Sequence, residues 1–591
     1  MDKGSINNGS LAETTATRSH ERIPIFVTIT FILAMLAVKL QLLIGMPVNQ
    51  DEFAYLSRIY DYQRGALSAP WQNIHVHLFQ WLHLFARDEI TQIMAGRIAM
   101  FCCFLGTLVF AYLLARHFLG ISGSLFSVLC YISLTFTLIH GASFRSDTPA
   151  IFLIAASLWL FVARGDSMLA NMLSGVAMSL AGLFTIKAGI YLILFAALLL
   201  IRPRLSRAPD GTSAGMKPAV WFACALMGGF ALFYCLHRAT LAPSDAFQQG
   251  KFITGSYSSF IDLIQFFPAL QYFLMTLRSD TLIWLLLTGG LVINIIDLFL
   301  RKDTRIPPTS YLFVFALPLL SLLVYRNAFP YFYVFILPCT VMLCGYTTDR
   351  LASFLKGIRS VASSVVLGFL ALAISTNGTM NTSHFRIYGP QLAAAQKDLL
   401  TVIHRIFPQP VTYFDGCRMV SSFPNAGFFM SSAGMRSYYR YGEKALKDRI
   451  IARKPLFLLA NVPNLDVRSM EPPPSATGFA LRQDDWDALR SCFIHHWGPV
   501  WVLGKHFSLT GENPKEQFDI VAEGSYSVET EGEVILDDMP YRSGMVVSLR
   551  EGAHTIEAKS GSVKAILRWG NHLYRPDNEP TWPDLFLGPF L

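Results

Sequence analysis

The sequence is poor in charged residues for its length. Of its 591 residues only 15% are charged and 53% are hydrophobic, and the mean hydropathy is +0.41. A soluble protein carries roughly a quarter charged residues, so this chain lacks the polar side chains needed to cover a water-facing surface of its size. This shortage excludes a purely cytosolic enzyme, a disordered scaffold and a fibrous protein.

Basic runs and cysteine clusters are also missing. The net charge is only +8, and no basic run is long enough to follow a nucleic-acid backbone, which excludes nucleic acid as the expected partner. The nine cysteines are scattered, and no CxxC spacing predicts a zinc site. Only Cys417 and Cys492 fall outside the hydrophobic part of the chain, and their spacing leaves open whether they form a disulfide.

Long hydrophobic runs dominate the first two thirds of the chain. A bilayer core about 30 Å thick needs roughly 20 apolar residues per helix. The first run, Ile23–Gly45, has no small-residue cleavage site directly behind it, so we expect a retained helix and not a signal peptide. The other predicted spans are 93–115, 119–139, 148–163, 168–183, 185–201, 218–237, 279–300, 309–325, 329–347 and 360–376. These make eleven spans, and we predict a polytopic α-helical membrane protein.

The lysines and arginines of the short loops predict the orientation of the helices. Cytoplasmic loops are enriched in these residues, and the tail 1–22 is predicted to be cytoplasmic. The loops on that side carry Arg116, Arg164, Arg202, Arg204, Arg207, Lys217, Arg301, Lys302, Arg305, Arg350, Lys356 and Arg359. An odd number of spans then places everything after residue 376 outside the cytoplasm. We expect the plasma membrane of a bacterium, that is, the inner membrane.

The predicted domains follow from this topology. Residues 23–376 form the transmembrane domain, and its outer loop 46–92 carries interfacial helices. Residues 377–591 regain proline, glycine and charge and are predicted to be a soluble outer domain. Its part 377–510 alternates strands and helices as in an α/β unit, and its part 511–591 has the period of a small antiparallel β-sandwich.

Charged residues at the outer ends of the spans are the first candidates for chemistry. Asp51 and Glu52 follow the first span directly, where a carboxylate in a cavity would serve as a general base. Arg145 and Asp147 follow the third span and lie at the same predicted membrane level. Helix capping explains both pairs equally well, because acids are favoured at helix N-termini.

A lysine and an aromatic segment extend this set. Lys187 lies within an apolar stretch, near the outer end of the sixth span. An ionisable residue in a span indicates function, and a phosphate is a suitable counter-charge, although a lysine that snorkels to the interface fits as well. Arg326 precedes an aromatic run that contains Tyr331. This run suits contact with an anionic headgroup and a sugar, or an ordinary interfacial aromatic belt.

Three histidines of the first outer loop complete the candidates. His75 and His77 are two residues apart, and His83 follows. Two residues at this spacing share a face only in an extended segment. Solvated or hydrogen-bonded histidines are therefore more expected than a metal site.

Taken together, these segments resemble the integral-membrane glycosyltransferases of the C superfamily, in particular the branch of the protein O-mannosyltransferases and the aminoarabinose-to-lipid A transferases. The resemblance rests on short motifs that occur in the family's order between residues 23 and 347. They are Asp51-Glu52-Phe53-Ala54-Tyr55, Gly96-Arg97-Ile98, Arg145-Ser146-Asp147-Thr148-Pro149, Leu183-Phe184-Thr185-Ile186-Lys187, and Phe329-Pro330-Tyr331-Phe332-Tyr333 with Pro338.

The resemblance implies a glycosyltransferase that uses a sugar on a polyprenyl phosphate and works at the outer face of the membrane. On this pattern Asp51 is the base that deprotonates an acceptor hydroxyl, and Asp147 is a second catalytic acid. Lys187 would stabilise the developing phosphate charge. The residues expected to bind substrate are Glu52, Tyr55, Arg145, Lys187, Arg326 and Tyr331. The acceptor is a hydroxyl of lipid A, a polysaccharide, a protein or another lipid.

One departure from the pattern concerns a metal site. The aminoarabinose branch has an acid-Lys-Pro element in the first outer loop, whereas this chain reads Trp71-Gln72-Asn73-Ile74 there. No cofactor is therefore certain, and His75 is the candidate ligand if a divalent metal ion binds. Two other hypotheses remain: a transporter or flippase for lipid-linked glycans, and a non-catalytic envelope-polysaccharide assembly protein. A transporter is expected to show repeated halves with charges near mid-membrane, and neither occurs here.

Overall fold

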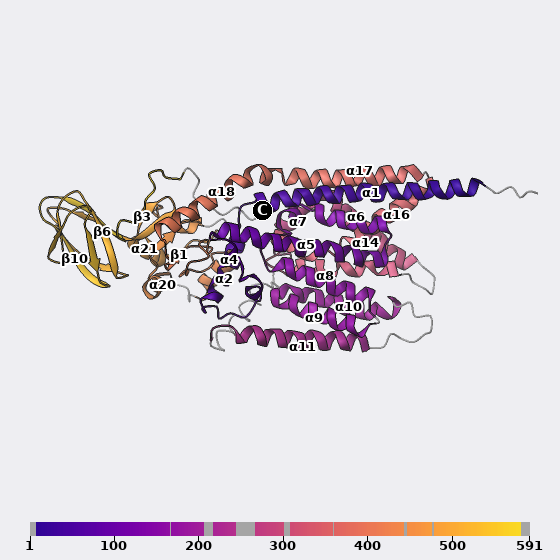
Figure 1. Ribbon diagram of the computed structural model, residues 1–591, viewed down its shortest axis with the longest axis horizontal. Coiled ribbons are helices and arrows are strands. Elements are labelled where there is room, and N and C mark those ends of the chain that lie inside the picture. The colour runs from indigo at the N-terminus through magenta and orange to yellow at the C-terminus, as the bar shows by residue number, and fades with distance from the viewer. Residues whose placement is uncertain are drawn as a thin grey trace, which may run out of the picture.

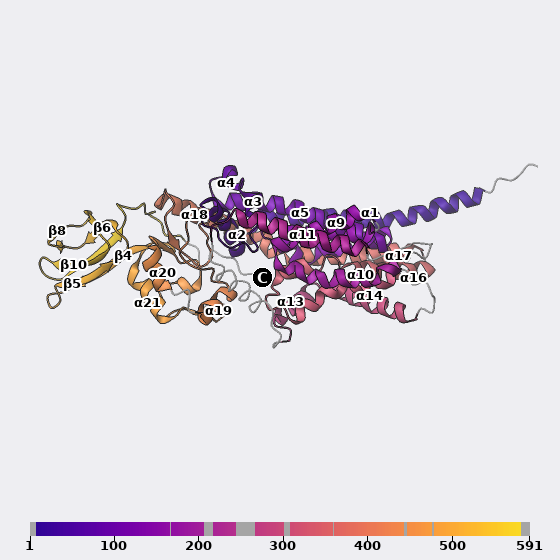
Figure 2. The ribbon, with the colours of Figure 1, turned by 90° about the horizontal axis from the view of Figure 1, so that it is seen from below.

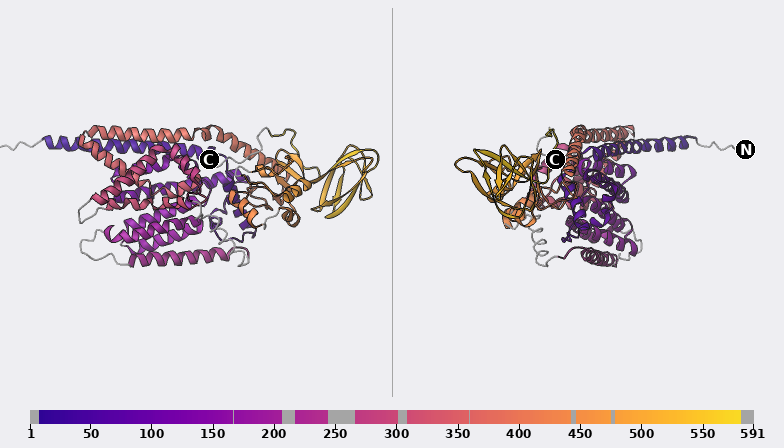
Figure 3. Two further views of the ribbon diagram at one scale, coloured as in Figure 1. Left: turned by 180° about the vertical axis from the view of Figure 1, so that it is seen from behind. Right: turned by 60° about the vertical axis from the view of Figure 1, so that its left-hand side comes forward.

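The computed structural model describes residues 8–165, 167–205, 217–243, 266–300, 308–358, 360–441, 446–474 and 478–580. The molecule is elongated, with a long helical bundle followed by a region that contains all of the described strands (Figure 1). The N-terminal part of the first helix projects from one end of the bundle, and the strands lie beyond the opposite end (Figure 3).

Helices occupy every predicted span. The first is α1 (Asn8–Gly45), which begins well before residue 23 and continues through Pro24. The following helices of the bundle are α5 (Glu89–Phe118), α6 (Ile121–Ser133), α7 (Thr135–His140), α8 (Asp147–Ala163), α9 (Met168–Phe184), η1 (Ile186–Gly189), α10 (Ile190–Leu205), α11 (Lys217–Ala239), α13 (Leu270–Ser279), α14 (Thr281–Leu300), η2 (Pro308–Leu323), α15 (Pro330–Ile336), α16 (Met342–Ile358) and α17 (Ser360–Asn381).

Within the described residues, five helical segments are long and apolar enough to cross a membrane. They are Ile23–Gly45, Glu89–Phe118, Lys217–Ala239, Thr281–Leu300 and Ala362–Ile406. Several other predicted spans are shorter or broken: the third is divided at Leu134, and the tenth is interrupted by a turn around Pro338. Proline lacks a backbone donor and clashes with the preceding turn, which ends α15. The chain is a multi-pass membrane protein, but the structure does not establish a count of eleven spans.

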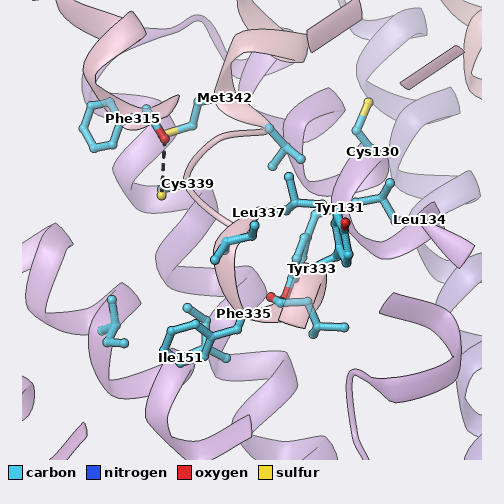
Figure 4. Close-up of a cluster of buried hydrophobic side chains, with 14 of the residues drawn as sticks. Cys130, Tyr131, Leu134, Ile151, Phe315, Tyr333, Phe335, Leu337, Cys339 and Met342 are labelled. Atoms are coloured by element: carbon cyan, nitrogen blue, oxygen red, sulfur yellow. Dashed lines mark hydrogen bonds between the residues drawn. The ribbon is translucent and has the colours of Figure 1, made fainter. Parts of the chain in front are cut away.

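A large hydrophobic core joins the helices near these breaks. In Figure 4, Tyr131 of α6, Ile151 of α8 and Tyr333 of α15 belong to one buried cluster. The Tyr131 hydroxyl donates a 2.8 Å hydrogen bond to the Val334 carbonyl, and the Cys339 thiol donates to the Phe315 carbonyl at 3.8 Å. These contacts satisfy carbonyls near the broken end of α15 and fix this short helix inside the bundle.

Short helices of the first outer loop lie at the end of the bundle that faces the strands (Figure 2). They are α2 (Gln50–Gln63), α3 (Val76–Phe79) and α4 (Leu82–Phe85). One buried hydrophobic cluster contains Phe53 of α2 and Phe457 of the C-terminal region. The first outer loop and the C-terminal region therefore share a core.

The C-terminal region starts with a long helix, after which strands and helices alternate. Helix α18 (Ser383–Ile406) follows α17 and leads away from the bundle (Figure 1). Its further helices are α19 (Ser432–Tyr441), α20 (Leu446–Arg453), η3 (Pro463–Leu465) and α21 (Gln483–Cys492). Its strands are β1 (Tyr413–Phe414), β2 (Phe457–Leu459), β3 (Phe493–Trp497), β4 (Val500–Leu509), β5 (Lys515–Ile520), β6 (Gly524–Thr530), β7 (Val534–Leu536), β8 (Met539–Tyr541), β9 (Val546–Leu549), β10 (Gly552–Ala558) and β11 (Val563–Trp569).

The strands form two sheets. The larger has the order β1-β2-β4-β11-β6-β9 with β3 paired to β4, and the smaller has the order β5-β10-β7-β8. Phe507 of β4 and Phe518 of β5 belong to one hydrophobic cluster that both sheets share. Strand β4 pairs with β2 and β3 and also with β11, so one strand connects the two parts predicted to meet near residue 510.

The structure settles the question of the cysteine pair, whereas several basic loop residues lie outside the described part of the chain. Cys417 and Cys492 do not pair, because both are free thiols in the structure. The basic loop residues Arg207, Arg301, Lys302, Arg305 and Arg359 lie outside the described residues.

Candidate active site

Four charged side chains from separate parts of the chain meet in one ion-pair network. Asp51 lies in the first turn of α2, Arg145 precedes α8, Asp147 begins α8, and Lys187 lies in η1. Lys187 Nζ donates to Asp147 Oδ1 at 2.8 Å and to Oδ2 at 3.0 Å. The Arg145 guanidinium is ion-paired with Asp51 and lies 3.5 Å from Asp147 Oδ2. The structure thus brings together four residues that the sequence analysis selected independently.

An aromatic ring covers both cations of this network. Tyr331 lies at the start of α15, whose first residue is Pro330. The centre of its ring is 3.5 Å from the Arg145 guanidinium carbon and 4.6 Å from Lys187 Nζ. A cation over a ring face is stabilised by the ring quadrupole. Tyr331 therefore holds the two cations side by side, and its predicted role in substrate binding stays a prediction.

The network is balanced in charge and largely buried. Its two acids face two cations, and the exposed fractions of the side chains are 9% for Arg145 and 11% for both Asp147 and Lys187. Buried charges are tolerated only when they are paired. The Asp51 side chain is the most accessible of the four, at 23%. A molecule that arrives from outside would therefore meet the Asp51 carboxylate first.

The start of α2 holds Asp51 in place. Asn49 caps the helix, and its side-chain oxygen accepts hydrogen bonds from the backbone N–H groups of Asp51 at 3.0 Å and Glu52 at 3.2 Å. The Glu52 side chain in turn accepts from the Asn49 backbone N–H at 3.1 Å. This reciprocal pair is a capping box. The helix-capping explanation of the Asp51-Glu52 pair is thus correct for Glu52.

Glu52 does not have the substrate-binding position that the sequence analysis assigned to it. Its side chain has no exposed surface, and its oxygens accept hydrogen bonds from Arg97 Nε at 2.8 Å, Arg97 Nη2 at 2.5 Å and the Phe144 N–H at 2.8 Å. Arg97 also donates to the carbonyls of the α1–α2 connection. Glu52 therefore fastens α2 to α5. Both of its carboxylate oxygens already accept hydrogen bonds within the protein, so neither is left to bind a substrate.

Tyr55 and His75 pack against each other beside the network. Their ring centres are 3.3 Å apart and the ring planes are nearly parallel. His75 Nε2 lies 3.1 Å from the Tyr55 carbonyl oxygen. Burial lowers the pKa of His75 well below its usual value, so this ring is neutral. The Tyr55 hydroxyl is buried and has no hydrogen-bond partner among the residues that the structure describes, so it is able to donate to a bound molecule.

The metal-ligand hypothesis for His75 is not supported. Its ring is fully buried against Tyr55. Among the residues that the structure describes, no three His, Cys, Asp or Glu side chains gather as a metal ion would require. His77 and His83 also lie apart from the network: His77 Nε2 is 2.8 Å from His237 Nδ1, and His83 Nδ1 is 2.7 Å from Gln63 Nε2.

Two cavities lie near the network, and neither is lined by Asp51, Asp147 and Lys187 together. A small cavity of about 10 Å³ beside the network is lined by Asp147, Arg145 and Tyr331, but not by Asp51 or Lys187. A larger cavity of about 380 Å³ lies between α1, α7 and α18. His140 lines both cavities. Arg326 is half-buried in the connection between η2 and α15, and its role in substrate binding stays a prediction.

The sequence analysis gave no role to two arginines near this site. Arg97, which holds Glu52, lies within an apolar span, and an arginine there is itself a signal of function or of a buried partner. Arg58 lies seven residues after Asp51 on α2. The helical repeat from Asp51 through Tyr55 would have placed it on the face of the site.

Comparisons with known proteins give a fold but no close relative. No family model matches the sequence, and no curated protein matches it. The crystal structure of the apo oligosaccharyltransferase from Archaeoglobus fulgidus is similar over 94% of this chain and 98% of its own, with 9% identity and a TM-score of 0.52. ArnT from Cupriavidus metallidurans bound to undecaprenyl phosphate is similar over 67% of this chain and 85% of its own, with 14% identity and a TM-score of 0.46.

The first of these similarities confirms the expected fold. It extends over nearly the whole length of both chains, so it includes the bundle and the C-terminal region together. The chain therefore shares the fold of this oligosaccharyltransferase, in line with the helical membrane bundle and C-terminal region expected from the sequence. At this low identity the similarity is one of fold, and the function has to be argued from the site.

Proposed function

We propose that the protein is a membrane glycosyltransferase that moves a sugar from a polyprenyl-phosphate donor to an acceptor hydroxyl. One observation carries this proposal: Asp51, Arg145, Asp147 and Lys187 form a single network around Tyr331 at the starts of four separate elements, α2, α8, η1 and α15. Residues that serve only as local helix caps would not need to meet in this way.

The reaction suits this arrangement of charges. A hydroxyl is a weak nucleophile near neutral pH, so its attack on the anomeric carbon benefits from a positioned base. In our proposal the accessible Asp51 carboxylate accepts the hydroxyl proton. The bond between the anomeric carbon and the phosphate oxygen breaks, and the polyprenyl phosphate leaves with the bonding electron pair.

The cations of the network suit the leaving group. Phosphate carries its full negative charge only when the bond to the sugar breaks, and a fixed cation stabilises that charge without reorganisation. Lys187 supplies this charge in our proposal. Asp147 binds Lys187 through both carboxylate oxygens, so it orients the ammonium group and competes with phosphate for it. The resemblance to glycosyltransferases in the motif segments supports a polyprenyl-phosphate donor.

The proposed reaction takes place at the extracytoplasmic face. The N-terminal part of α1 and the strands lie at opposite ends of the bundle (Figure 3), and α2, which carries Asp51, packs against the C-terminal region. The basic residues of the short loops predict that the tail 1–22 is cytoplasmic. With that orientation, the site and residues 407–580 face outward. In a bacterium this is the periplasmic side of the inner membrane.

Two experiments test the proposal. The first compares envelope glycans and glycolipids by mass spectrometry in cells with and without the protein: we expect one sugar to be missing from a defined acceptor, and identical profiles would contradict the proposal. The second fuses a reporter after residue 410, beyond α18. A reporter that is active only in the cytosol would contradict the outward orientation while leaving the chemistry untouched.

A further inference from the structure

The face of α2 that starts at Asp51 carries two more polar groups. Asp51, Tyr55 and Arg58 are spaced by four and three residues, which places them on one side of the helix. Asp51 contacts Arg145, and the buried Tyr55 hydroxyl has no hydrogen-bond partner within the described part of the chain. Burial raises the pKa of this hydroxyl well above its usual value, so it stays protonated and can donate a hydrogen bond.

Arg58 is only weakly neutralised. It is half-buried, and its Nη1 group donates to two neutral oxygens, Asn73 Oδ1 at 2.9 Å and the Gln72 carbonyl at 3.4 Å. Among the described residues it forms no ion pair within 4.0 Å. Its Nε and Nη2 groups donate no hydrogen bond to any described residue, since both hydrogen bonds of Arg58 come from Nη1. Two of the best donors for an oxyanion are thus available.

Positive charge is in excess around Arg58. The acids Asp51 and Asp147 already balance Arg145 and Lys187. On the other side of Arg58, the single carboxylate of Asp61 is shared by Arg64 at 2.8 Å and Arg418 at 2.7 Å. Burial, followed by the charge of Arg418, lowers the pKa of Arg58, while the charges of Asp51 and Asp61 act in the opposite direction. An anion bound here would relieve the repulsion.

We propose that Arg58 and Tyr55 form a binding site for a phosphate group on the acceptor substrate, next to the hydroxyl that attacks the sugar. This inference rests on the proposed function, because it presupposes an acceptor. The guanidinium fork and a phenolic donor suit the several oxygens of a phosphate.

The position along the helix assigns this site to the acceptor and not to the donor. Lys187, which serves the donor phosphate in our proposal, lies in η1 and is linked to Asp51 through Asp147 and Arg145. Arg58 lies about two turns further along α2, roughly 10 Å from Asp51 at about 1.5 Å per residue. There it faces Arg418, which the C-terminal region contributes. An acceptor whose hydroxyl reaches Asp51 would place a neighbouring phosphate at Arg58.

Binding measurements on the full chain in nanodiscs test the site without turnover. The acceptor probe is glucose 6-phosphate compared with glucose, titrated by saturation-transfer NMR, and the donor probe is undecaprenyl phosphate. We expect the wild type to prefer glucose 6-phosphate, and Arg58→Gln to weaken that binding about tenfold, as the loss of a charge-assisted hydrogen bond predicts. Undecaprenyl phosphate should bind equally well to both.

Control variants keep the result interpretable. Arg64→Gln removes a cation from the same helix that already has Asp61 as its partner, and it should change neither affinity. Arg58→Lys should restore part of the affinity. Tyr55→Phe removes only an unpaired hydroxyl, so this variant should fold normally. It should weaken the binding of glucose 6-phosphate a few-fold. This variant keeps the test valid if Arg58→Gln does not fold.

Two results would overturn the inference. Unchanged binding of glucose 6-phosphate in folded Arg58→Gln and in Tyr55→Phe would show that the two residues bind no such anion. A loss of undecaprenyl phosphate binding in Arg58→Gln would assign the site to the donor instead. Neither result depends on catalysis, so a failure of the proposed transfer reaction would be seen separately, in the glycan profiles.

Discussion

The buried Glu52–Arg97 ion pair provides a direct test of how the first outer loop is held. Glu52→Gln keeps the shape of the side chain but leaves the Arg97 guanidinium buried without its counter-charge, with an amide NH₂ facing donors at 2.5–3.1 Å. Removal of one partner from a buried pair costs about 3–5 kcal/mol. We therefore expect the melting temperature of the purified protein in detergent to fall by several degrees. Turnover should fall with it, because the ion pair with Arg97 that fastens the start of α2, and with it Asp51, is lost.

A surface acid gives the matched control for this substitution. Glu551 is 49% exposed and pairs with Lys454. Exposed pairs contribute about 0–1 kcal/mol, so Glu551→Gln should melt like the wild type. The variant Glu52→Gln/Arg97→Met removes both charges and should recover part of the lost stability, since no unpaired charge remains. If Glu52→Gln melted like Glu551→Gln, the structural role of Glu52 would be refuted.

Two further predictions concern the donor and the C-terminal region. Lys187→Met should weaken undecaprenyl phosphate binding about tenfold or more, whereas Lys397→Met, at an exposed lysine, should not weaken it. Equal affinities of Lys187→Met and the wild type in a titration would show that Lys187 does not bind the donor. Burial, together with the charge of Arg568, lowers the pKa of His496 to about 4. The folded state therefore binds fewer protons than the unfolded state between pH 6.5 and 4, and strand β3 should lose about 2 kcal/mol of stability between pH 7 and pH 5. Hydrogen exchange corrected for intrinsic rates should show this loss in the wild type and not in His496→Gln; a pH-independent wild type would contradict the predicted protonation.

The sequence predicted the local features of the fold well. Hydrophobic runs of about membrane length located the helices, and alternating apolar residues located strands such as β6 and β11. The breaks were less visible. Pro338 is in the sequence, but whether a proline kinks a helix or ends it depends on what replaces the lost hydrogen bond, here the packing around α15. The early start of α1 was missed, because a polar helix carries no membrane signal.

The candidate site was predicted in its members but not in its pairings. Asp51, Arg145, Asp147 and Lys187 stood out because charges are rare at membrane level. Which acid would pair with which cation depends on how α2, α8 and η1 pack, and no short-range pattern encodes this. The separation of neighbours such as Asp51 and Glu52, one in the network and one in the helix cap, follows from their different directions on α2. Arg58 was missed because a half-buried arginine on an amphipathic helix resembles an ordinary surface residue.

The central claim is that Asp51 is the catalytic base, and turnover of Asp51→Asn tests it most directly. Asparagine keeps the size of the side chain but does not take up the hydroxyl proton. We predict that undecaprenyl phosphate binding survives while transfer to the acceptor found in the glycan comparison falls by roughly 10²–10⁴-fold. Asp466→Asn, at an ion-paired acid of similar exposure in the C-terminal region, should transfer at the wild-type rate. Near-normal transfer by folded Asp51→Asn would contradict the account.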